Sequence, residues 1–401
     1  MSIAPKKRRV PLGRTVLGLM VTLGLLLAGV GTASASTAQG WLVVSAGGFH
    51  TCGIKAADRS LWCWGYNGYG ELGVGDTVDR TEPTLVSSHA WATVSAGTYH
   101  TCGLYTNGTR FCWGRNSSGE LGIGDTTDRN APRRLLGEAA WSSIDAGDYH
   151  SCGIRTDATV YCWGDNLFGE LGVGDNTNRS APTLVSSHAW ATVSAGSYHT
   201  CGLYTNGTRF CWGRNSNGEL GIGDTTNRNA PRRLLGEPAW ASVDAGGLHS
   251  CGVRADATLY CWGLNDVGQL GTGDTTTQAR PAQVAGGGTW SSVSAGFLNT
   301  CGILTAFDDV QCWGKAQSGV VGYNAYDFNS AVHPNQLRPS HVLYNSTAVS
   351  IGLRHVCTVQ NQFATSSGDL RYGAFCWGDN SYHETHPEDG DNPSYPHMLP
   401  Y

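Results

Sequence analysis

Six histidines recur at one fixed place in a repeated pattern, two positions before a cysteine, and imidazole is the side chain best suited to proton transfer near neutral pH. They are His50, His100, His150, His199, His249 and His355. Six such groups raise a metal or acid-base hypothesis. In one further unit Asn299 takes the same place. Because an amide can make a similar hydrogen bond, we interpret these histidines as structural groups that bond within their own unit.

Fourteen cysteines fall two per unit, and an even number of this kind predicts disulfides in an exported chain. If residues 106–108 form a three-residue turn with Gly108 in the left-handed conformation, Cys102 lies directly opposite Cys112. A two-residue turn would place the two cysteines on opposite faces of the ribbon. The clustered Cys-x-x-Cys spacing of zinc sites is absent. The expected bridges are Cys52 to Cys63, Cys102 to Cys112, Cys152 to Cys162, Cys201 to Cys211, Cys251 to Cys261, Cys301 to Cys312 and Cys357 to Cys376.

Two groups of acidic residues could suggest a metal, and both have a simpler interpretation. Aspartates follow a glycine at the same place in five units, where a Gly-Asp turn explains them without calcium: Asp76, Asp125, Asp175, Asp224 and Asp274. The tail gathers His383, Glu384, His386, Glu388, Asp389, Asp391 and His397, and we expect a solvated loop there. Whether that tail binds a metal stays open. No nucleophile elbow, H-E-x-x-H or phosphate-binding loop occurs, so no catalytic residue, cofactor or metal is assigned.

The elements that carry these residues are repeats of about 50 residues. A tryptophan opens six of them, at Trp41, Trp91, Trp141, Trp190, Trp240 and Trp290, and a seventh without it starts near Thr347. Residues 85–137 and 184–236 differ at three positions only, which indicates duplication of a two-unit block. Such a fixed period decides the architecture before any single motif does.

Each unit contains short segments of β-branched and aromatic residues between turn residues. In the second unit, Trp91 to Gly97 is an expected strand, residues 102–105 and 109–113 an expected hairpin, and Pro132 to Leu136 an expected fourth strand. Four antiparallel strands in seven units predict an all-β, seven-bladed β-propeller spanning residues 36–401. A linear solenoid would need distinct capping ends. The last strand, Pro396 to Tyr401, is expected to complete the ring beside the first blade.

The pattern resembles the regulator of chromosome condensation repeat family over nearly all of residues 41 to 330. The A-G-x-x-H stretches carry the resemblance together with C-W-G-x-N-x-x-G-E/Q-L-G-x-G-D stretches such as Cys261 to Asp274. The resemblance implies a seven-bladed propeller. The cysteine pairs make the chain similar to plant crinkly-type receptor ectodomains and to secreted bacterial propellers, one class of which inhibits β-lactamases by direct contact. The nuclear member's nucleotide-exchange role is not implied for an exported, acidic chain.

The first 35 residues have the layout of a secretory signal peptide. Basic residues up to Arg14 precede an apolar run from Thr15 to Val30, and Ala33 to Ala35 offers a cleavage site. A membrane anchor, nuclear import through residues 5–10 and twin-arginine export are the alternatives. Residues 1–35 contain five basic residues and no acidic ones, so their removal changes the formal net charge from −5 to −10. Nucleic acid and membrane insertion are therefore not expected for the secreted product.

Variable residues within otherwise uniform units predict where a partner binds. The loop before each histidine and the C-W-G-x-N loop should emerge on one face, because they join strands one to two and three to four. The expected function is that of an extracellular or cell-surface monomer that binds a protein or glycan, and inhibition of a protein partner is one form that this binding can take. The alternatives are an extracellular lyase or hydrolase and a structural surface component. Aromatic residues and arginines are enriched where partners dock. The candidate residues are Phe49, Tyr66, Tyr69, Tyr99, Arg115, Tyr149, Phe168, Tyr198, Arg214, Leu248, Leu298 and Arg354.

Overall fold

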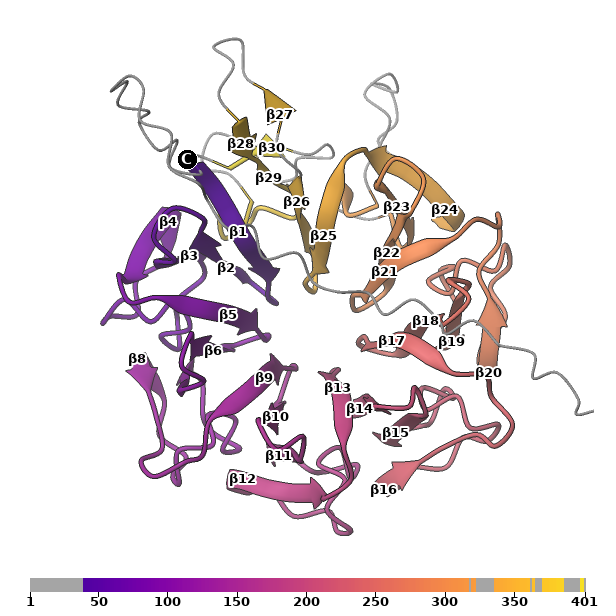
Figure 1. Cartoon of the computed structure of the whole chain (residues 1–401), viewed down its shortest axis with the longest axis horizontal. Coiled ribbons are helices and arrows are strands. Elements are labelled where there is room, and N and C mark those ends of the chain that lie inside the picture. The colour runs from indigo at the N-terminus through magenta and orange to yellow at the C-terminus, as the bar shows by residue number, and fades with distance from the viewer. Residues whose placement is uncertain are drawn as a thin grey trace, which may run out of the picture. The chain divides into compact units, whose positions relative to one another are not determined.

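Seven antiparallel sheets surround a common centre in the computed structural model (Figure 1). The structure describes residues 39–316, 319–321, 335–360, 363–364, 370–385 and 397–399. Within these ranges every sheet contains four strands of one unit, and the sheet of the first unit is extended by two short strands of the seventh. The predicted all-β, seven-bladed propeller is confirmed. The predicted signal peptide, residues 1–35, lies outside the described residues. No helix in the described part is long and apolar enough to cross a membrane.

Strand bounds repeat closely from blade to blade. Blade 1 contains β1 (Gln39–Ala46), β2 (His50–Lys55), β3 (Leu61–Gly65) and β4 (Arg80–Ser87). Blade 2 contains β5 (Trp91–Ala96), β6 (His100–Tyr105), β7 (Arg110–Gly114) and β8 (Arg129–Arg133). Blade 3 contains β9 (Trp141–Ala146), β10 (His150–Arg155), β11 (Val160–Gly164) and β12 (Arg179–Ser186). Blade 4 contains β13 (Trp190–Ala195), β14 (His199–Tyr204), β15 (Arg209–Gly213) and β16 (Arg228–Arg232).

The last three blades follow the same order with one insertion. Blade 5 contains β17 (Trp240–Ala245), β18 (His249–Arg254), β19 (Leu259–Gly263) and β20 (Gln278–Gln283). Blade 6 contains β21 (Trp290–Ala295), β22 (Asn299–Leu304), β23 (Asp309–Gly314) and β24 (Gln336–Leu343). Blade 7 contains β25 (Ser346–Ile351), β26 (His355–Gln360), β29 (Ala374–Gly378) and β30 (His397–Met398). Its insertion carries β27 (Phe363–Ala364) and β28 (Leu370–Tyr372).

The fourth strand begins earlier than the sequence pattern predicts. In blade 2 it spans Arg129–Arg133, whereas Pro132 to Leu136 was expected. Proline was taken as the start of the strand, yet Pro132 lies inside it. This is possible because β8 is the outer edge of its sheet, where a residue without an N–H costs no ladder hydrogen bond on the free side.

The hairpin register of the second and third strands matches the predicted bulged turn. The Tyr105 N–H donates to the Thr109 carbonyl at 3.0 Å, and Gly108 has a φ of 79°. Cys102 consequently faces Cys112, with 4.1 Å between their Cα atoms. All seven disulfides join the two cysteines of one unit, in the same pairs as the register predicted.

The opening tryptophan of a unit explains the glycine after its first cysteine. A Cβ at Gly53 would lie 2.6 Å from carbons of the Trp41 indole, which crosses over β2. The next five units repeat this pairing of tryptophan and glycine. Blade 7 has Ser346 in place of the tryptophan and accommodates Thr358 in place of the glycine.

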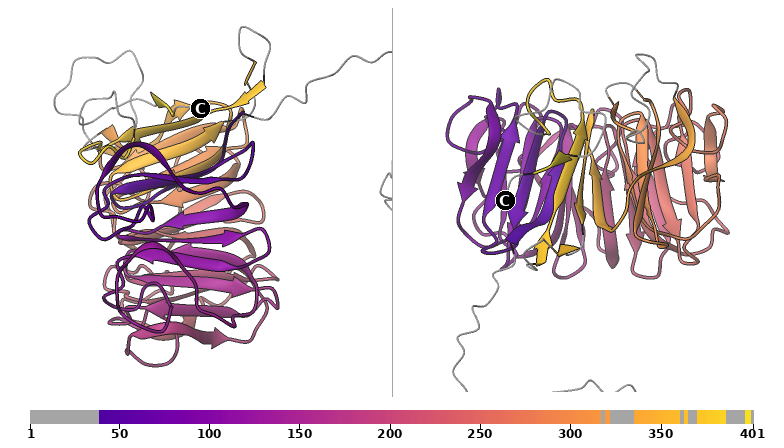
Figure 2. Two further views of the ribbon diagram at one scale, coloured as in Figure 1. Left: turned by 90° about the vertical axis from the view of Figure 1, so that its left-hand side faces the viewer. Right: turned by 90° about the horizontal axis from the view of Figure 1, so that it is seen from above.

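The hydrophobic core is divided among the interfaces between neighbouring blades, which stack side by side around the ring (Figure 2). Between blades 2 and 3 the Cys102 to Cys112 bridge packs with Leu121 and with both tryptophans of the next unit, Trp141 and Trp163. Each disulfide is thus part of an apolar interface rather than a surface staple. At the centre, alanine and glycine residues of all seven units line a narrow channel of about 80 Å³.

Contacts between blades 7 and 1 close the ring. β28 pairs in parallel with the start of β1, at Gln39 and Gly40. The described part of the predicted terminal strand, β30, takes the fourth place in blade 7 beside β29, as expected. Leu399, 1% exposed, packs in one cluster with Trp41 of blade 1. The parallel pairing of β28 was not predicted, because it comes from the longer turn of the divergent seventh unit.

Candidate partner-binding face

Two loops of each blade emerge on one face of the propeller, as strand directions predict. In blade 1 these are the β1–β2 loop, residues 47–49, and the β3–β4 loop, residues 66–79. A backbone hydrogen bond from the Tyr66 N–H to the Phe49 carbonyl, 2.9 Å long, joins the two loops. The equivalent bond from Arg115 to Tyr99 joins them in blade 2. Side chains of the two loops are therefore held next to each other.

A buried asparagine fixes the shape of the long β3–β4 loop, and every other blade except blade 6, which has Ala316, carries an asparagine at the same place. The Asn67 amide donates to the carbonyls of Asp76 and Val78, and its Oδ1 accepts from the Leu72 N–H. Asp76 in turn accepts from the Val78 N–H and pairs with Arg80 at 2.6 Å. The aspartate is thus satisfied by its own turn. Among the described residues no group of three or more His, Cys, Asp or Glu side chains has a metal-binding arrangement.

A buried glutamate lies beneath the same loop. The Glu71 carboxylate is fully buried; Oε2 accepts from the Tyr69 N–H at 2.8 Å, and Oε1 has no hydrogen-bond partner in the described part of the chain. Burial is the largest cause that raises the pKa of Glu71, to about 8. Glu170 and Glu384 lie at the same place in blades 3 and 7, and burial raises the pKa of each to about 7.

Glu71→Gln is expected to stabilise the protein more as pH rises. A carboxyl whose pKa is raised in the fold contributes stability that is complete below the unfolded pKa and is lost as pH rises through about 8. Glutamine avoids that loss, on the order of 2 kcal/mol at alkaline pH. Blade 5 already uses it: Gln269 Oε1 accepts from the Val267 N–H at 3.1 Å. Urea unfolding at about pH 5 and pH 9 measures the change, and Gln269→Glu is the reverse control. An equal stability difference at both pH values would contradict the expectation.

The six repeated histidines bond to the next blade, not within their own, so that part of the sequence interpretation is wrong. His50 Nε2 lies 2.8 Å from Thr101 Oγ1, and the equivalent contact in the following blade joins His100 to Ser151 at 2.8 Å. His355 closes the circle by reaching Thr51 of blade 1 at 2.7 Å. We call each of these six contacts a histidine latch. Asn299 does not substitute for one, because Val356 has the place of the hydroxyl that would accept from it.

The hydroxyl of each latch determines which histidine nitrogen carries the proton. The Thr101 hydroxyl donates its single proton to the Glu71 carbonyl at 2.8 Å, so it must accept from the His50 Nε2–H. Burial holds the imidazole neutral by lowering the pKa of His50 to about 3. His100, His150, His199 and His249 have the same lowered pKa, about 3. These groups are fixed donors in blade interfaces.

Five aromatic side chains gather over blades 7, 1 and 2. Phe49 stacks on Tyr99 with ring centroids 5.4 Å apart, and Tyr69 meets the edge of Tyr99 at 5.3 Å. Tyr66 contacts Phe49 at 6.3 Å and Tyr382 at 5.1 Å. Four of these residues were predicted from the sequence. Tyr382 was not, although Asn380 two residues earlier matches Asn67 and could have identified its place.

A second group of three rings lies over blades 3 and 4. Tyr149 stacks on Tyr198 at 5.2 Å, and Phe168 meets the edge of Tyr198 at 5.5 Å. Partial burial, followed by a hydrogen bond with Tyr198, raises the pKa of Tyr149 to about 12. The Tyr149 phenol therefore stays neutral at physiological pH.

The three predicted arginines lie at the edges of these rings. Arg115 lies between the groups, with its guanidinium 5.9 Å from the Tyr99 ring and 5.6 Å from the Tyr149 ring. Arg214 lies 5.9 Å from Tyr198. Arg354, about half exposed, lies 5.5 Å from Phe49. The aromatic and cationic groups together form one partly exposed band, which we call the aromatic band.

Two predicted positions fall outside the band. Leu248 and Leu298 precede the latch position in blades 5 and 6, where each side chain is partly exposed. They carry no ring, so at this position the side chains change from aromatic in blades 1 to 4 to aliphatic in blades 5 and 6. The binding role of these twelve residues stays a prediction.

The described part of the tail belongs to the framework. Glu384 and Thr385 are buried, and the Glu384 carbonyl accepts from the Thr51 hydroxyl and the Trp64 indole. The Glu384 carbonyl therefore accepts the same two hydrogen bonds from blade 1 that the Glu71 carbonyl accepts from Thr101 and Trp113 of blade 2. The expected solvated loop is wrong for residues 384–385. His386, Glu388, Asp389, Asp391 and His397 lie outside the residues whose side chains are described.

Sequence comparison finds one repeat family in the chain. Profiles of the regulator of chromosome condensation (RCC1) repeat match residues 43–71, 91–120, 141–170, 190–219 and 240–269 in one set. A second set, offset by part of a unit, matches residues 58–104, 107–154, 157–203, 206–253 and 256–302. No curated protein sequence matches the chain.

Solved structures share the fold at low identity. Prp20p from Saccharomyces cerevisiae, described with its binding properties to Gsp1p and histones, has a TM-score of 0.72 and 20% identity, and covers 90% of this chain and 87% of its own. The structure of Kap60 bound to yeast RCC1 (Prp20) gives a TM-score of 0.72 and 19% identity, and the match covers 96% of this chain and 91% of the matched chain. The CRINKLY WD40 ectodomain of the Arabidopsis thaliana receptor kinase ACR4 has a TM-score of 0.51 and 20% identity, and the match covers 89% of this chain and 97% of that ectodomain chain.

Proposed function

Since this chain belongs to the regulator of chromosome condensation (RCC1) repeat family, we propose that it is an exported propeller that binds a protein partner through its aromatic band. The observation that carries the proposal is the band itself, formed by loops that differ while their framework stays constant. Tyrosine, phenylalanine and arginine side chains dominate the centres of protein interfaces.

Export is supported by two observations. The first 35 residues have the layout of a signal peptide, and seven disulfides form reliably only in an oxidising compartment. Similarity in fold to a receptor ectodomain agrees with an extracellular location. The nuclear relative is described with Gsp1p and histones, whereas this acidic exported chain would meet other proteins.

Binding rather than catalysis is supported by the state of the repeated titratable groups. The histidines that first suggested acid-base chemistry are buried, neutral and bonded to the next blade. The aspartates of the long loops are bound to arginines or to turn N–H groups. The exposed groups of the face are rings and guanidinium groups, which contribute contact area and not proton transfer.

The triple variant Tyr99→Ala, Tyr149→Ala and Tyr198→Ala is expected to weaken partner binding by about 1 kcal/mol or more, roughly fivefold, without unfolding the protein. The partner is first captured with oxidised protein from the secreted proteins of the producing cell, and envelope polysaccharides serve as a parallel bait. Titration calorimetry then compares wild type and variant.

Asn107→Ala and Asn206→Ala provide the matched control, because both residues lie in exposed hairpin turns on the opposite face. Normal binding by the tyrosine variant, combined with loss of binding in the asparagine variants, would assign the function to that other face. Capture of a polysaccharide alone would overturn the choice of a protein partner.

A further inference from the structure

The interface between blades 6 and 7, here called the 6–7 seam, departs from the other interfaces at three framework positions. Asn299 occupies the place of a latch histidine, and Val356 occupies the place of the hydroxyl residue that would accept from it. Val320 occupies the place of the buried glutamate, because its carbonyl accepts from the Trp377 indole as the Glu120 carbonyl accepts from Trp163. All three changes remove a polar partner from the same interface.

The first consequence is a buried amide without its usual bond. Asn299 is 4% exposed, and its Oδ1 has no hydrogen-bond partner in the described part of the chain. Val356 has no oxygen that could accept from the Asn299 amide as Thr101 accepts from His50. A buried acceptor in this state costs free energy until a donor reaches it.

The second consequence is a cation without its internal counter-ion. In blades 2 and 4 the residue after Trp-Gly is an arginine that pairs with the buried glutamate of the same loop: Arg115 with Glu120 at 3.8 Å, and Arg214 with Glu219 at 3.7 Å. Lys315 has the same position in blade 6, but Val320 replaces the glutamate. No ion pair of Lys315 occurs among the described residues.

These changes surround a cavity of about 340 Å³ on the same face as the aromatic band. Four large apolar side chains line it, namely Phe49, Phe297, Leu298 and Leu353, and its polar lining is Asn299, Lys315, Arg354 and Asp379. Arg354 and Asp379 pair at 3.3 Å, and the second oxygen of Asp379 accepts from the Ser381 N–H. Lys315 therefore leaves the lining with one uncompensated positive charge.

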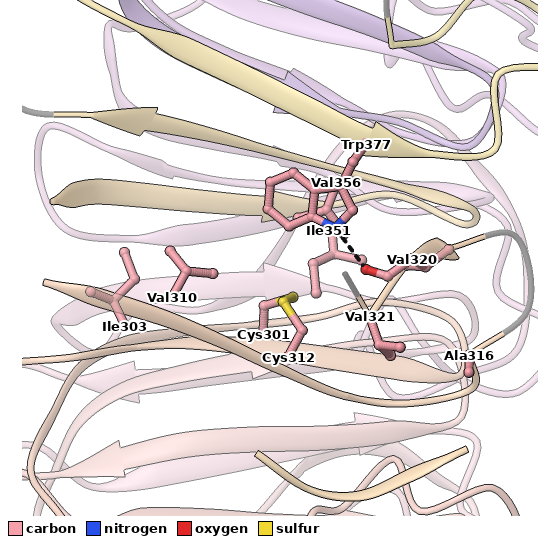
Figure 3. Close-up of a cluster of buried hydrophobic side chains, with 10 residues drawn as sticks. All are labelled: Cys301, Ile303, Val310, Cys312, Ala316, Val320, Val321, Ile351, Val356 and Trp377. Atoms are coloured by element: carbon pink, nitrogen blue, oxygen red, sulfur yellow. Dashed lines mark hydrogen bonds between the residues drawn. A yellow bond between two sulfur atoms is a disulfide. The ribbon is translucent and has the colours of Figure 1, made fainter. Parts of the chain in front are cut away.

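Figure 3 shows the apolar side of the 6–7 seam. Val320, Val321, Ile351 and Val356 lie close to Trp377, whose indole nitrogen donates to the Val320 carbonyl at 2.9 Å. Val320 belongs to this buried cluster and also lines the cavity. The cavity is thus bounded by packed side chains of both blades.

We propose that the seam cavity binds a carboxylate carried on an apolar body, with the carboxylate at Lys315 and Arg354. The ligand supplies the negative charge that is lost where Val320 replaces the buried glutamate. The apolar walls contact the rest of the ligand. Two sources have this chemistry: the C-terminal residue of a peptide and an acidic side chain.

Titration of the oxidised protein with three small probes tests the site and its source. N-acetyl-leucine represents a C-terminus, N-acetyl-glutamate α-amide an acidic side chain, and N-acetyl-leucinamide lacks the charge. We expect at least one carboxylate to bind roughly tenfold more tightly than the neutral amide, since charge-assisted hydrogen bonds are the stronger kind. The tighter of the two carboxylates identifies the source. Equal binding of all three probes, or none, would overturn the proposal.

Three variants connect binding to the residues named. Lys315→Met should weaken carboxylate binding roughly tenfold, whereas Arg133→Met, which removes an exposed charge on β8, should leave it unchanged. Val320→Glu should abolish binding by restoring the internal carboxylate, and Val320→Gln, of equal size without charge, should reduce it less. Equal loss in the glutamate and glutamine variants, or normal binding by Lys315→Met, would overturn the assignment. Because no partner protein is involved, this result is independent of the proposed partner-binding function.

Discussion

Protein that is denatured, reduced and returned to native buffer is expected to remain unfolded, whereas the oxidised protein should refold. Six bridges close loops of 10 or 11 residues and the seventh a loop of 19. A loop of this size contributes somewhat under about 3 kcal/mol in the chain-entropy account, so seven together approach about 20 kcal/mol. Since a whole domain is stable by only about 5–15 kcal/mol, loss of all seven should abolish folding. Circular dichroism of the two samples measures the difference.

The folded protein should nevertheless resist reductant without denaturant. All fourteen cysteines are fully buried, so a thiol reaches them only when a blade opens. Alkylation of the reduced, denatured sample prevents reoxidation during the comparison. Recovery of the native spectrum by the alkylated chain would show that the blade interfaces suffice without the bridges.

Deleting residues 394–401 is expected to cause the second large effect, a loss on the order of 4 kcal/mol of unfolding free energy. The deletion removes β30 and Leu399, whose N–H donates to the Ala374 carbonyl at 2.8 Å. Leu399 packs with residues of both blade 7 and blade 1, so its removal opens a cavity where the ring closes. Chemical unfolding of the oxidised protein measures the loss.

Leu399→Ala should reproduce a large part of this effect, because the side chain is buried in the cluster that joins blades 7 and 1. Leu136→Ala is the control for leucine removal, since Leu136 is 76% exposed on the rim. If the truncated protein matched wild type, β28, the histidine latch of His355 and the Glu384 carbonyl would be enough to close the ring without the terminal strand.

Local rules were enough to predict the framework from the sequence. The turn of residues 106–108 fixes which cysteines oppose each other, because one residue more or less would turn a side chain to the other face. The fixed period required a closed or stacked architecture, and short four-stranded units favoured closure. The fourth strand was misplaced because proline marks a strand edge only approximately, as Pro132 shows.

Contacts between units were beyond the sequence pattern, because they depend on which unit lies beside which. The latch partner of His50 is the hydroxyl of Thr101, 51 residues away, and the repeat alone does not show that it crosses the interface. One signal was present: Asn299 precedes the single unit that has Val356 in place of Thr or Ser. The chain lost donor and acceptor together at one interface, as physically coupled positions would.

The direction of the histidine latches has a consequence for how such a chain can grow. Every latch runs from the histidine of one unit to the hydroxyl of the following unit, and every hydroxyl donates back to the carbonyl of the unit before it. Any unit with a latch histidine can therefore stand before any unit with a latch hydroxyl. Each such unit offers the same donor to the unit that follows it and the same acceptor to the unit that precedes it. The near-identical stretches 85–137 and 184–236 lie 99 residues apart, so the copied block spanned two units and created only junctions that already existed. Gene duplication could thus lengthen the ancestral ring two blades at a time without inventing a new interface, while loop residues on the open face diverged freely.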